Sequence, residues 1–403
     1  MSICIHKSLI GTDLHLISDD GEFGWSRDVP PDSWLCGFSE DHHKSLDILS
    51  EAVSVNLKTS PSEAHTNMWS SLRPEGLLGV PWQWALKKGG FQAHIKQLLE
   101  QIDDLLERNH DSYYVKEFVT IRQFLQGMAR CKADHKGILK ILNDDRERDG
   151  SLRSFVPDSN GYLQQVRYSQ TSSCSGRLTV VAGPSILTLR KDRRSLLRSS
   201  LPGGKLIQVD FVSLEPRVAL STAGRESSGD IYQMVRDDVL GGSVTREKAK
   251  IATISSLYGM SARKLSEMIG DGDISGSRAV LSKIREYFDI PRLEKSLREE
   301  SRRVGKIKSH YGRLMDTEDI SNHVLVNRFI QSTATDAALL GFSEMVEKIS
   351  KLQIEAKPVF VIHDALILDV EDSSISNLES FLSKPLSLPK LSGTFPVSME
   401  IIA

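Results

Sequence analysis

The spacing of apolar residues predicts two long helices in the first third of the chain. Apolar side chains recur every three or four positions from Phe91 to Leu106, and again from Val115 to Met128, which is the period of an amphipathic helix. The polar break between them, at 109–112, is short, so we expect an antiparallel helical pair. The residues before position 80 mix short alternating segments with Pro, Ser and Gly, and they predict no particular architecture.

Beyond residue 200 the apolar runs become shorter and strand-like. A run at 205–214 predicts a buried strand, and 359–370 predicts a hairpin of two strands. The hairpin turn holds His363 and Asp364, and an isolated carboxylate, Asp210, lies within the earlier strand. An ionised carboxylate among apolar residues is costly unless a positive charge compensates it.

Asp210 and Asp364 together suit a site for divalent metal ions. Two carboxylates on apolar strands, far apart in sequence, are what such a shared site requires, because the metal compensates both charges. Two ions held roughly 3.5–4 Å apart can stabilise the attacking and the leaving oxygens of a phosphoryl transfer. The residues alone leave a second interpretation open, in which these are unrelated aspartates of a turn and a strand end.

A helical pattern covers 231–303, and one helix within it carries four notable side chains. They follow one another at intervals of four residues, which places them along one helix face about 18 Å long: Arg246, Lys250, Ile254 and Tyr258. Thr245 is a suitable N-cap for this helix. Two cations followed by an aliphatic and an aromatic residue suit a nucleoside triphosphate. The alternative is an exposed basic edge with Tyr258 in the core.

Composition narrows the class of protein. The chain has 403 residues, of which 39% are hydrophobic and 26% charged, as in a globular protein of two to four domains. Apolar stretches fall short of the roughly 18–20 residues of a membrane span, and the four cysteines form no CxxC pair. We therefore expect a cytoplasmic protein without a membrane partner or structural zinc.

The charge distribution is uneven although the net charge is only −2. Basic residues gather at 190–198 and at 285–313. Such runs are either solvated helix faces or surfaces that contact phosphate groups.

Six motifs, in order along residues 168–370, resemble those of the family A DNA polymerases, the bacterial polymerase-I-like group. In that family the helix motif reads R-x3-K-x3-F-x3-Y-G, and this chain matches it except for Ile254. The six motifs are "YSQTSSCSGRL" (168–178), "DFVSLEPR" (210–217), "GDIYQM" (229–234), the helix from Arg246 to Gly259, "NRFIQSTATD" (327–336) and "VIHDA" (361–365).

The resemblance implies an α+β protein with the right-hand polymerase fold: an antiparallel-sheet palm, helical fingers and a helical thumb. It divides the chain into an N-terminal region of unknown role (1–85), the thumb (86–155), the first part of the palm (156–228), the fingers (229–320) and the second part of the palm (321–403). Residues 1–85 are fewer than a typical domain needs, so we expect no full exonuclease domain and no proofreading. A bacterial, phage or plasmid context fits this short form.

The resemblance also implies template-dependent DNA synthesis. Primer–template DNA and dNTPs are the expected partners, and two Mg²⁺ ions, for which Mn²⁺ can substitute, are the expected cofactors. The sequence assigns no replication accessory proteins. Asp210 and Asp364 would hold the metals, and Lys250 would complete the catalytic set as a general acid.

Contacts to the substrates are implied for further residues. The incoming nucleotide would meet Arg246, Lys250, Ile254, Tyr258 and Glu215. Of these, Glu215 would exclude a 2′-hydroxyl group. DNA would meet Arg177, Asn327, Gln331 and His363, of which the first three resemble readers of the minor groove, where every base pair presents acceptors.

Two departures from the family pattern keep other functions open. Ile254 replaces the aromatic residue of the helix motif, and Ala365 replaces the glutamate that follows the His-Asp pair. A single-subunit RNA-synthesising polymerase of the same superfamily also has an aliphatic residue in that helix, although Glu215 argues against this function. A degenerate polymerase fold that binds primer–template without catalysis is the third interpretation.

Overall fold

The structure is a computed structural model that describes residues 2–19, 21–37, 44–60, 81–82, 86–110, 112–144, 149–269, 272–318 and 320–403. These residues fall into two compact units, Met1–Val115 and Lys116–Ala403. The two long helices predicted from the apolar spacing are present as α5 (Lys88–Asn109) and α6 (Tyr114–Gln126). The division between the units falls at the start of α6, inside the segment expected to form the thumb.

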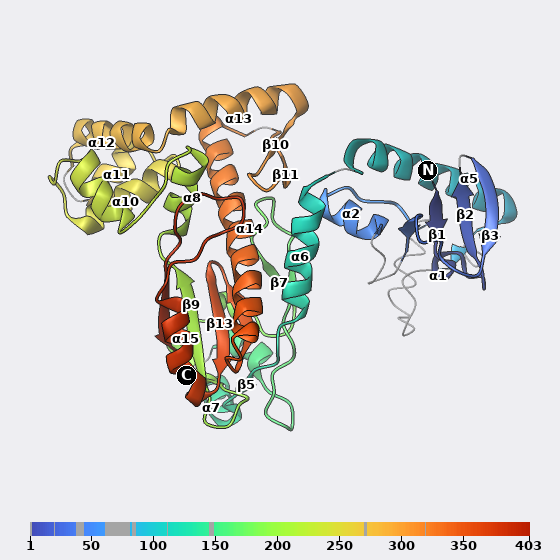
Figure 1. The fold of residues 1–403 in the computed structure, drawn as a ribbon, viewed down its shortest axis with the longest axis horizontal. Helices are drawn as coiled ribbons and strands as arrows, with labels where there is room; N and C mark the ends of the chain where they lie inside the picture. The colour runs from blue at the N-terminus through green and yellow to red at the C-terminus, as the bar shows by residue number, and fades with distance from the viewer. Residues whose placement is uncertain are drawn as a thin grey trace. The chain divides into compact units, whose positions relative to one another are not determined.

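The first unit is built on a small sheet that the apolar pattern did not predict. Its strands pair in the order β3-β2-β1-β4 (Figure 1), and all pairs are antiparallel except β1 with β4. The strands are β1 (Ile3–Ile5), β2 (His15–Asp19), β3 (Glu22–Ser26) and β4 (Trp34–Cys36), accompanied by α1 (Lys7–Ile10) and α2 (Leu46–Ala52). The predicted site residues all lie outside this unit.

The second unit contains an antiparallel sheet in the order β12-β13-β9-β14. The strands are β9 (Lys205–Phe211), β12 (Ala356–Ile362), β13 (Ala365–Val370) and β14 (Val397–Ile401). The predicted hairpin is confirmed as β12 and β13, and the predicted buried strand as β9, which ends at Phe211. All six residues of β13 are buried, because this strand lies inside the sheet with a neighbour on each side.

One long helix, α14 (Asn322–Lys351), runs alongside this sheet (Figure 1). Phe342 of α14 stacks on Phe211 of β9, with 5.1 Å between the ring centroids. A β-carbon at Gly341 would overlap the Leu388 side chain and would lie 3.3 Å from the Phe211 ring, so the missing side chain lets Leu388 pack closely against the helix beside this strand. Helix α8 (Leu214–Thr222) packs against α14, and α15 (Ile375–Leu382) packs against β14.

A cluster of helices between β9 and α14 in sequence forms a separate apolar core. It consists of α9 (Ile231–Met234), a π-helical turn (Val235–Val239), α10 (Arg246–Leu257), α11 (Ala262–Ile269), α12 (Ile274–Tyr287) and α13 (Ile290–Val304). Buried side chains from all of these elements form the core, together with the first part of α14. The helical pattern predicted at 231–303 is therefore confirmed.

Shorter elements connect the main parts of the second unit. Three strand pairs are β5 (Lys132–Ala133) with β8 (Leu197–Arg198), β6 (Arg167–Ser169) with β7 (Thr179–Ala182), and β10 (Lys306–Lys308) with β11 (Leu314–Asp316). The remaining helical segments are α7 (His135–Leu142) and 3₁₀ turns at Gly150–Phe155, Ile186–Thr188, Lys191–Leu196 and Asp372–Ser374. Helices and an antiparallel sheet thus make up this unit, and the predicted α+β class is confirmed.

Candidate active site

The sheet brings Asp210 and Asp364 to one end of two neighbouring strands. Asp210, on β9, lies directly opposite Ala365, the first residue of β13. Asp364 precedes Ala365 in the tight turn of the hairpin, and its carbonyl oxygen accepts a hydrogen bond from Phe211 N–H (3.3 Å). His363, the other turn residue, has a positive φ of 55°, which lets the chain reverse within two residues.

A phenol hydroxyl group fixes the edge of this hairpin. Tyr168 Oη donates to the carbonyl oxygen of Val361 and accepts from its N–H, both at 2.9 Å. Among the described strands, β12 lies at the edge of the sheet, so no strand pairs with these two backbone groups. Tyr168 therefore satisfies both groups two residues before the turn that carries Asp364.

Both aspartates line a cleft of about 340 Å³. Eight residues that the sequence predicted for the site line it: Arg177, Asp210, Glu215, Lys250, Ile254, Gln331, His363 and Asp364. Among the residues that the structure describes, the cleft lining does not include the predicted Arg246, Tyr258 and Asn327.

The surroundings of Asp210 disfavour its ionised form. Burial, and next the nearby charge of Asp364, raise the pKa of Asp210 to about 6, while Arg194 and Lys191 act in the opposite direction. Within the described part of the chain, no group of three or more His, Cys, Asp and Glu side chains could hold a metal ion. Paired carboxylates are nevertheless a donor set that suits Mg²⁺, which takes one or two carboxylates and completes its shell with water and phosphate oxygens.

Glu215 lies on the first turn of α8 and faces the same cleft. The Tyr258 hydroxyl donates to its carboxylate at 2.7 Å, and Arg177 Nη2 lies 3.3 Å from Oε1. Burial raises the pKa of Glu215, and these two donors counteract it. Tyr258 therefore reaches the site through its hydrogen bond to Glu215.

Arg217 holds the turn between β9 and α8 that presents Glu215. Its side chain is 1% exposed. Its guanidinium donates to the carbonyl oxygens of Val212 (3.0 Å), Thr394 (3.1 Å) and Gly229. One buried cation therefore joins backbone segments from three separate parts of the sequence.

Helix α10 begins as predicted, with the Thr245 side chain accepting from Lys248 N–H (3.3 Å). Lys250 lines the cleft, whereas Arg246 Nε pairs with Asp230 at 2.7 Å. Both cations lie over the ring of Tyr232, at 5.6 Å for Arg246 Cζ and 5.7 Å for Lys250 Nζ. The Asp230 carboxylate also caps α9 by accepting the N–H groups of Tyr232 and Gln233.

Residues 151–401 match the family model described as DNA polymerase family A. This chain belongs to DNA polymerase family A. The match covers β9 with Asp210, the β12–β13 hairpin with Asp364, α8, the helical cluster and α14.

Curated relatives of this family A chain include DNA polymerases I of thermophilic bacteria. The thermostable DNA polymerase I of Thermus caldophilus is 24% identical over 295 residues, covering 63% of this chain and 34% of that protein. DNA polymerase I of Aquifex aeolicus is 24% identical over 240 residues, covering 54% and 41%. The DNA polymerase of Mycobacterium phage L5 is 28% identical over 142 residues, covering 34% and 23%. This chain therefore spans well under half the length of these relatives.

A solved structure similar to this family A chain is the polymerase domain of Pol1 from M. smegmatis, in complex with DNA primer-template and dNTP. It is 14% identical, with a TM-score of 0.47, and the match covers 88% of this chain and 62% of that one. In the described part of the present chain, no helix is long and apolar enough to span a membrane.

Sequence reasoning missed several residues of the site. Tyr232 and Asp230 lie in the motif "GDIYQM", which the resemblance singled out without giving them a role, and Tyr232 lines the cleft. Asp is a preferred N-cap residue, and Asp230 directly precedes the helical segment predicted from 231, so its capping role could have been found. Tyr168 and Arg217 act on backbone groups far away in sequence, which no local pattern reveals.

Proposed function

We propose that this chain is a template-dependent DNA polymerase that adds dNTPs to a primer 3′ end by two-metal nucleotidyl transfer. The observation that carries the proposal is the meeting of Asp210, Asp364 and Lys250 in one cleft. Family membership supports the same reaction class, because the motif containing each of these residues lies within the matched region.

The two carboxylates are the metal-holding groups in this proposal. Asp210 and Asp364 bind two Mg²⁺ ions, or Mn²⁺ in their place, and the ions supply Lewis-acid stabilisation of the attacking and leaving oxygens. The raised pKa of Asp210 supports this role, since burial and next the charge of Asp364 disfavour its ionised form, and a bound cation would offset both. Lys250 donates a proton to the leaving pyrophosphate.

The nucleotide contacts follow from the order of residues along α10. Arg246 and Lys250 bind the triphosphate, with Ile254 further along the helix beside the sugar. Arg246 Nε is paired with Asp230 at 2.7 Å, and the Nη groups of its guanidinium supply the donors for the phosphates. Glu215, held by Tyr258, occupies the space beneath the sugar and excludes a 2′-hydroxyl group.

Arg177, Asn327, Gln331 and His363 make the proposed DNA contacts. Asn327 and Gln331 lie one turn apart on α14, so both can face the minor groove of the primer terminus. In this assignment the β9-containing sheet with α14 is the palm, the helical cluster from α9 to α13 is the fingers, and the segment at 86–155 is the thumb. Synthesis without proofreading is part of the proposal.

Primer extension tests this function. We expect the chain to extend a labelled primer with dNTPs and Mg²⁺, to extend it poorly with rNTPs, and to be inactive when metal is chelated. Equal extension with rNTPs would favour RNA synthesis. Binding of primer–template with no extension under any condition would favour a degenerate binding protein. A primer with a mispaired 3′ end, scored for shortening, tests the absence of proofreading.

A further inference from the structure

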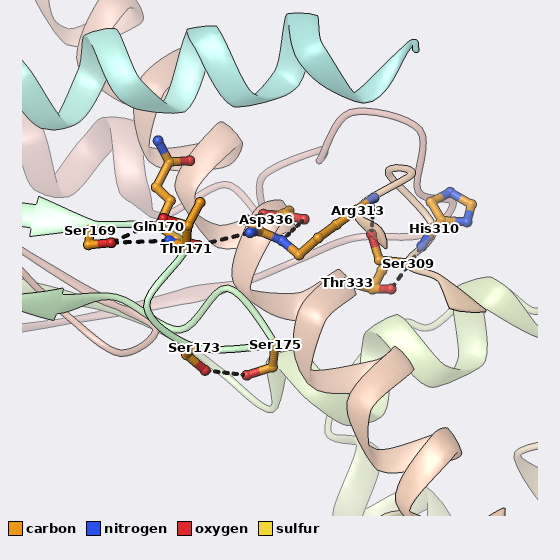
Figure 2. Close-up of polar contacts among 10 residues, drawn as sticks. All are labelled: Ser169, Gln170, Thr171, Ser173, Ser175, Ser309, His310, Arg313, Thr333 and Asp336. Atoms are coloured by element: carbon orange, nitrogen blue, oxygen red, sulfur yellow. Dashed lines mark hydrogen bonds and ion pairs between the residues drawn. The ribbon is translucent and has the colours of Figure 1, made fainter. Parts of the chain in front are cut away.

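The last residue of the motif "NRFIQSTATD", Asp336, has no part in the proposed chemistry, yet it is fully buried. It forms an ion pair with Arg313, whose side chain is 5% exposed. Arg313 Nη2 donates to Asp336 Oδ1 at 2.6 Å and Nε donates to Oδ2 at 3.2 Å. This two-point contact joins the turn between β10 and β11 to α14 (Figure 2).

The remaining nitrogen of the Arg313 guanidinium, Nη1, faces the loop 170–176. It donates to the carbonyl oxygen of Gln170 at 2.9 Å, as Figure 2 shows. At the other end of the loop, Gly176 has a φ of 74°, and a β-carbon there would overlap the Arg313 guanidinium carbon. The backbone at Gly176 therefore lies directly against the guanidinium, and one cation holds both ends of the loop.

The residue that follows Gly176 is Arg177, which lines the cleft. Arg177 contacts the Glu215 carboxylate at 3.3 Å and the Tyr258 hydroxyl at 3.4 Å. Asp336 lies five residues after Gln331 on the same helix, α14. The ion pair therefore links the backbones that carry two of the proposed minor-groove residues.

A second contact keeps the β10–β11 turn in place on α14. The backbone N–H of His310 donates to Thr333 Oγ1 at 3.1 Å, and Ser309 Oγ accepts from Arg313 N–H at 3.1 Å. Both contacts appear in Figure 2. The turn is therefore attached to α14 at two points, Thr333 and Asp336.

We propose that Arg313 is a positioning residue that sets the place of Arg177 relative to α14, and thereby the ability of the site to distinguish a matched from a mismatched primer terminus. This inference rests on the proposed function, in which Arg177 donates to minor-groove acceptors of the terminal base pair. A matched pair presents these acceptors at fixed places. If Arg177 is displaced, its hydrogen bond to a matched terminal pair is lost and the affinity for matched ends falls. The affinity for mismatched ends changes little, because such ends do not present the acceptors at these places.

Substitution by lysine isolates the geometric role of Arg313. Arg313→Lys keeps the positive charge beside Asp336 but removes the planar fork that contacts Asp336, Gln170 and Gly176 together. Gly176→Ala attacks the same contact from the loop side and leaves the ion pair chemically intact. Its matched control is Gly203→Ala, where φ is also positive (66°) but a β-carbon would meet open space.

The measurement is the affinity for primer–template with a matched or a mismatched terminal pair, by fluorescence anisotropy without metal or dNTP. We expect wild type to prefer the matched end, and Arg177→Ala, Arg313→Lys and Gly176→Ala each to reduce this preference by about tenfold. Gly203→Ala should keep the wild-type preference. In the double variant Arg177→Ala/Arg313→Lys, the preference for the matched end should be no lower than in Arg177→Ala alone.

The inference would be overturned if the double variant lost the product of the two single-variant reductions in preference. It would also be overturned if Arg313→Lys and Gly176→Ala both kept the wild-type preference. If Arg313→Lys does not fold, the comparison of Gly176→Ala with Gly203→Ala tests the inference instead. Binding without primer extension would overturn the proposed polymerase activity alone, since the affinity ratios would still report on Arg313. A wild type that does not bind primer–template would overturn both.

Discussion

At the scale of single residues, the Asp210 carboxyl group lies where its charge is unfavourable. Its pKa is raised from 3.8 to about 6, chiefly by burial and next by Asp364. A raised folded-state pKa means that the folded protein holds this proton more tightly than the unfolded chain. The ionised group therefore destabilises the fold as pH rises from about 4, with its full effect above about pH 6.

Asp210→Asn should consequently stabilise the metal-free protein while it abolishes primer extension. We expect a gain of about 1 kcal/mol at pH 8, because partial exposure of the carboxyl group screens the full effect of the pKa shift. The gain should shrink between pH 6 and pH 4. Thermal unfolding in chelator measures it, and added Mg²⁺ should then raise the melting temperature of wild type more than that of the variant. A variant less stable than wild type at pH 8 would contradict this.

Glu215 determines the choice of sugar in this account. Glu215→Ala removes the side chain proposed to lie beneath the 2′ position, so the ratio of ribonucleotide to deoxyribonucleotide incorporation should rise by about tenfold or more. Tyr258→Phe keeps the ring but removes the hydroxyl donor to Glu215, and it should raise the ratio less. Single-nucleotide incorporation with dNTP and rNTP measures both variants. An unchanged ratio in Glu215→Ala would remove the basis for this assignment.

At the scale of elements, α10 places its two cations in different surroundings. Lys250 lines the cleft, whereas Arg246 is paired with Asp230. If Lys250 acts mainly in the transition state, Lys250→Ala should lower the maximal rate by roughly 10²–10³-fold and change the apparent KM less. Arg246→Ala, which removes ground-state binding of the triphosphate, should mainly raise KM. Pre-steady-state incorporation gives both parameters, and wild-type values in both variants would mean that α10 does not face the nucleotide.

Asp230→Asn provides a matched variant for Arg246. The asparagine keeps a side-chain oxygen for the N–H groups of Tyr232 and Gln233, so the cap of α9 remains. It removes the negative charge that pairs with Arg246. We therefore expect a lower KM for dNTP than in wild type, the opposite of Arg246→Ala.

The elements also show what the sequence could and could not predict. Strand β9, the β12–β13 hairpin and the N-cap of α10 were predictable, because each depends on a local period or a capping residue. The sheet of the first unit was not, because strands of three to five residues such as β1 and β4 carry too short a pattern.

At the scale of the whole molecule, the parts of the site that escaped prediction are buried polar contacts between distant segments. Tyr168 bonds Val361, which is 193 positions away, and Arg217 bonds Thr394, which is 177 positions away. Such contacts form only once the sheet and α8 are assembled, so no pattern within a short stretch encodes them. The family resemblance indicated the residues that we propose to react, and the structure adds residues that contact the backbone near them.

The central claim is that Asp210 and Asp364 serve the chemistry rather than the binding of DNA. Duplex affinity comes mainly from phosphate contacts elsewhere, whereas metal-holding carboxylates are needed for the transfer step. The most direct test measures primer extension and primer–template affinity together in wild type, Asp210→Ala and Asp364→Ala. Both variants should lose extension while their dissociation constants for primer–template stay near the wild-type value. Robust extension by either variant would contradict the claim.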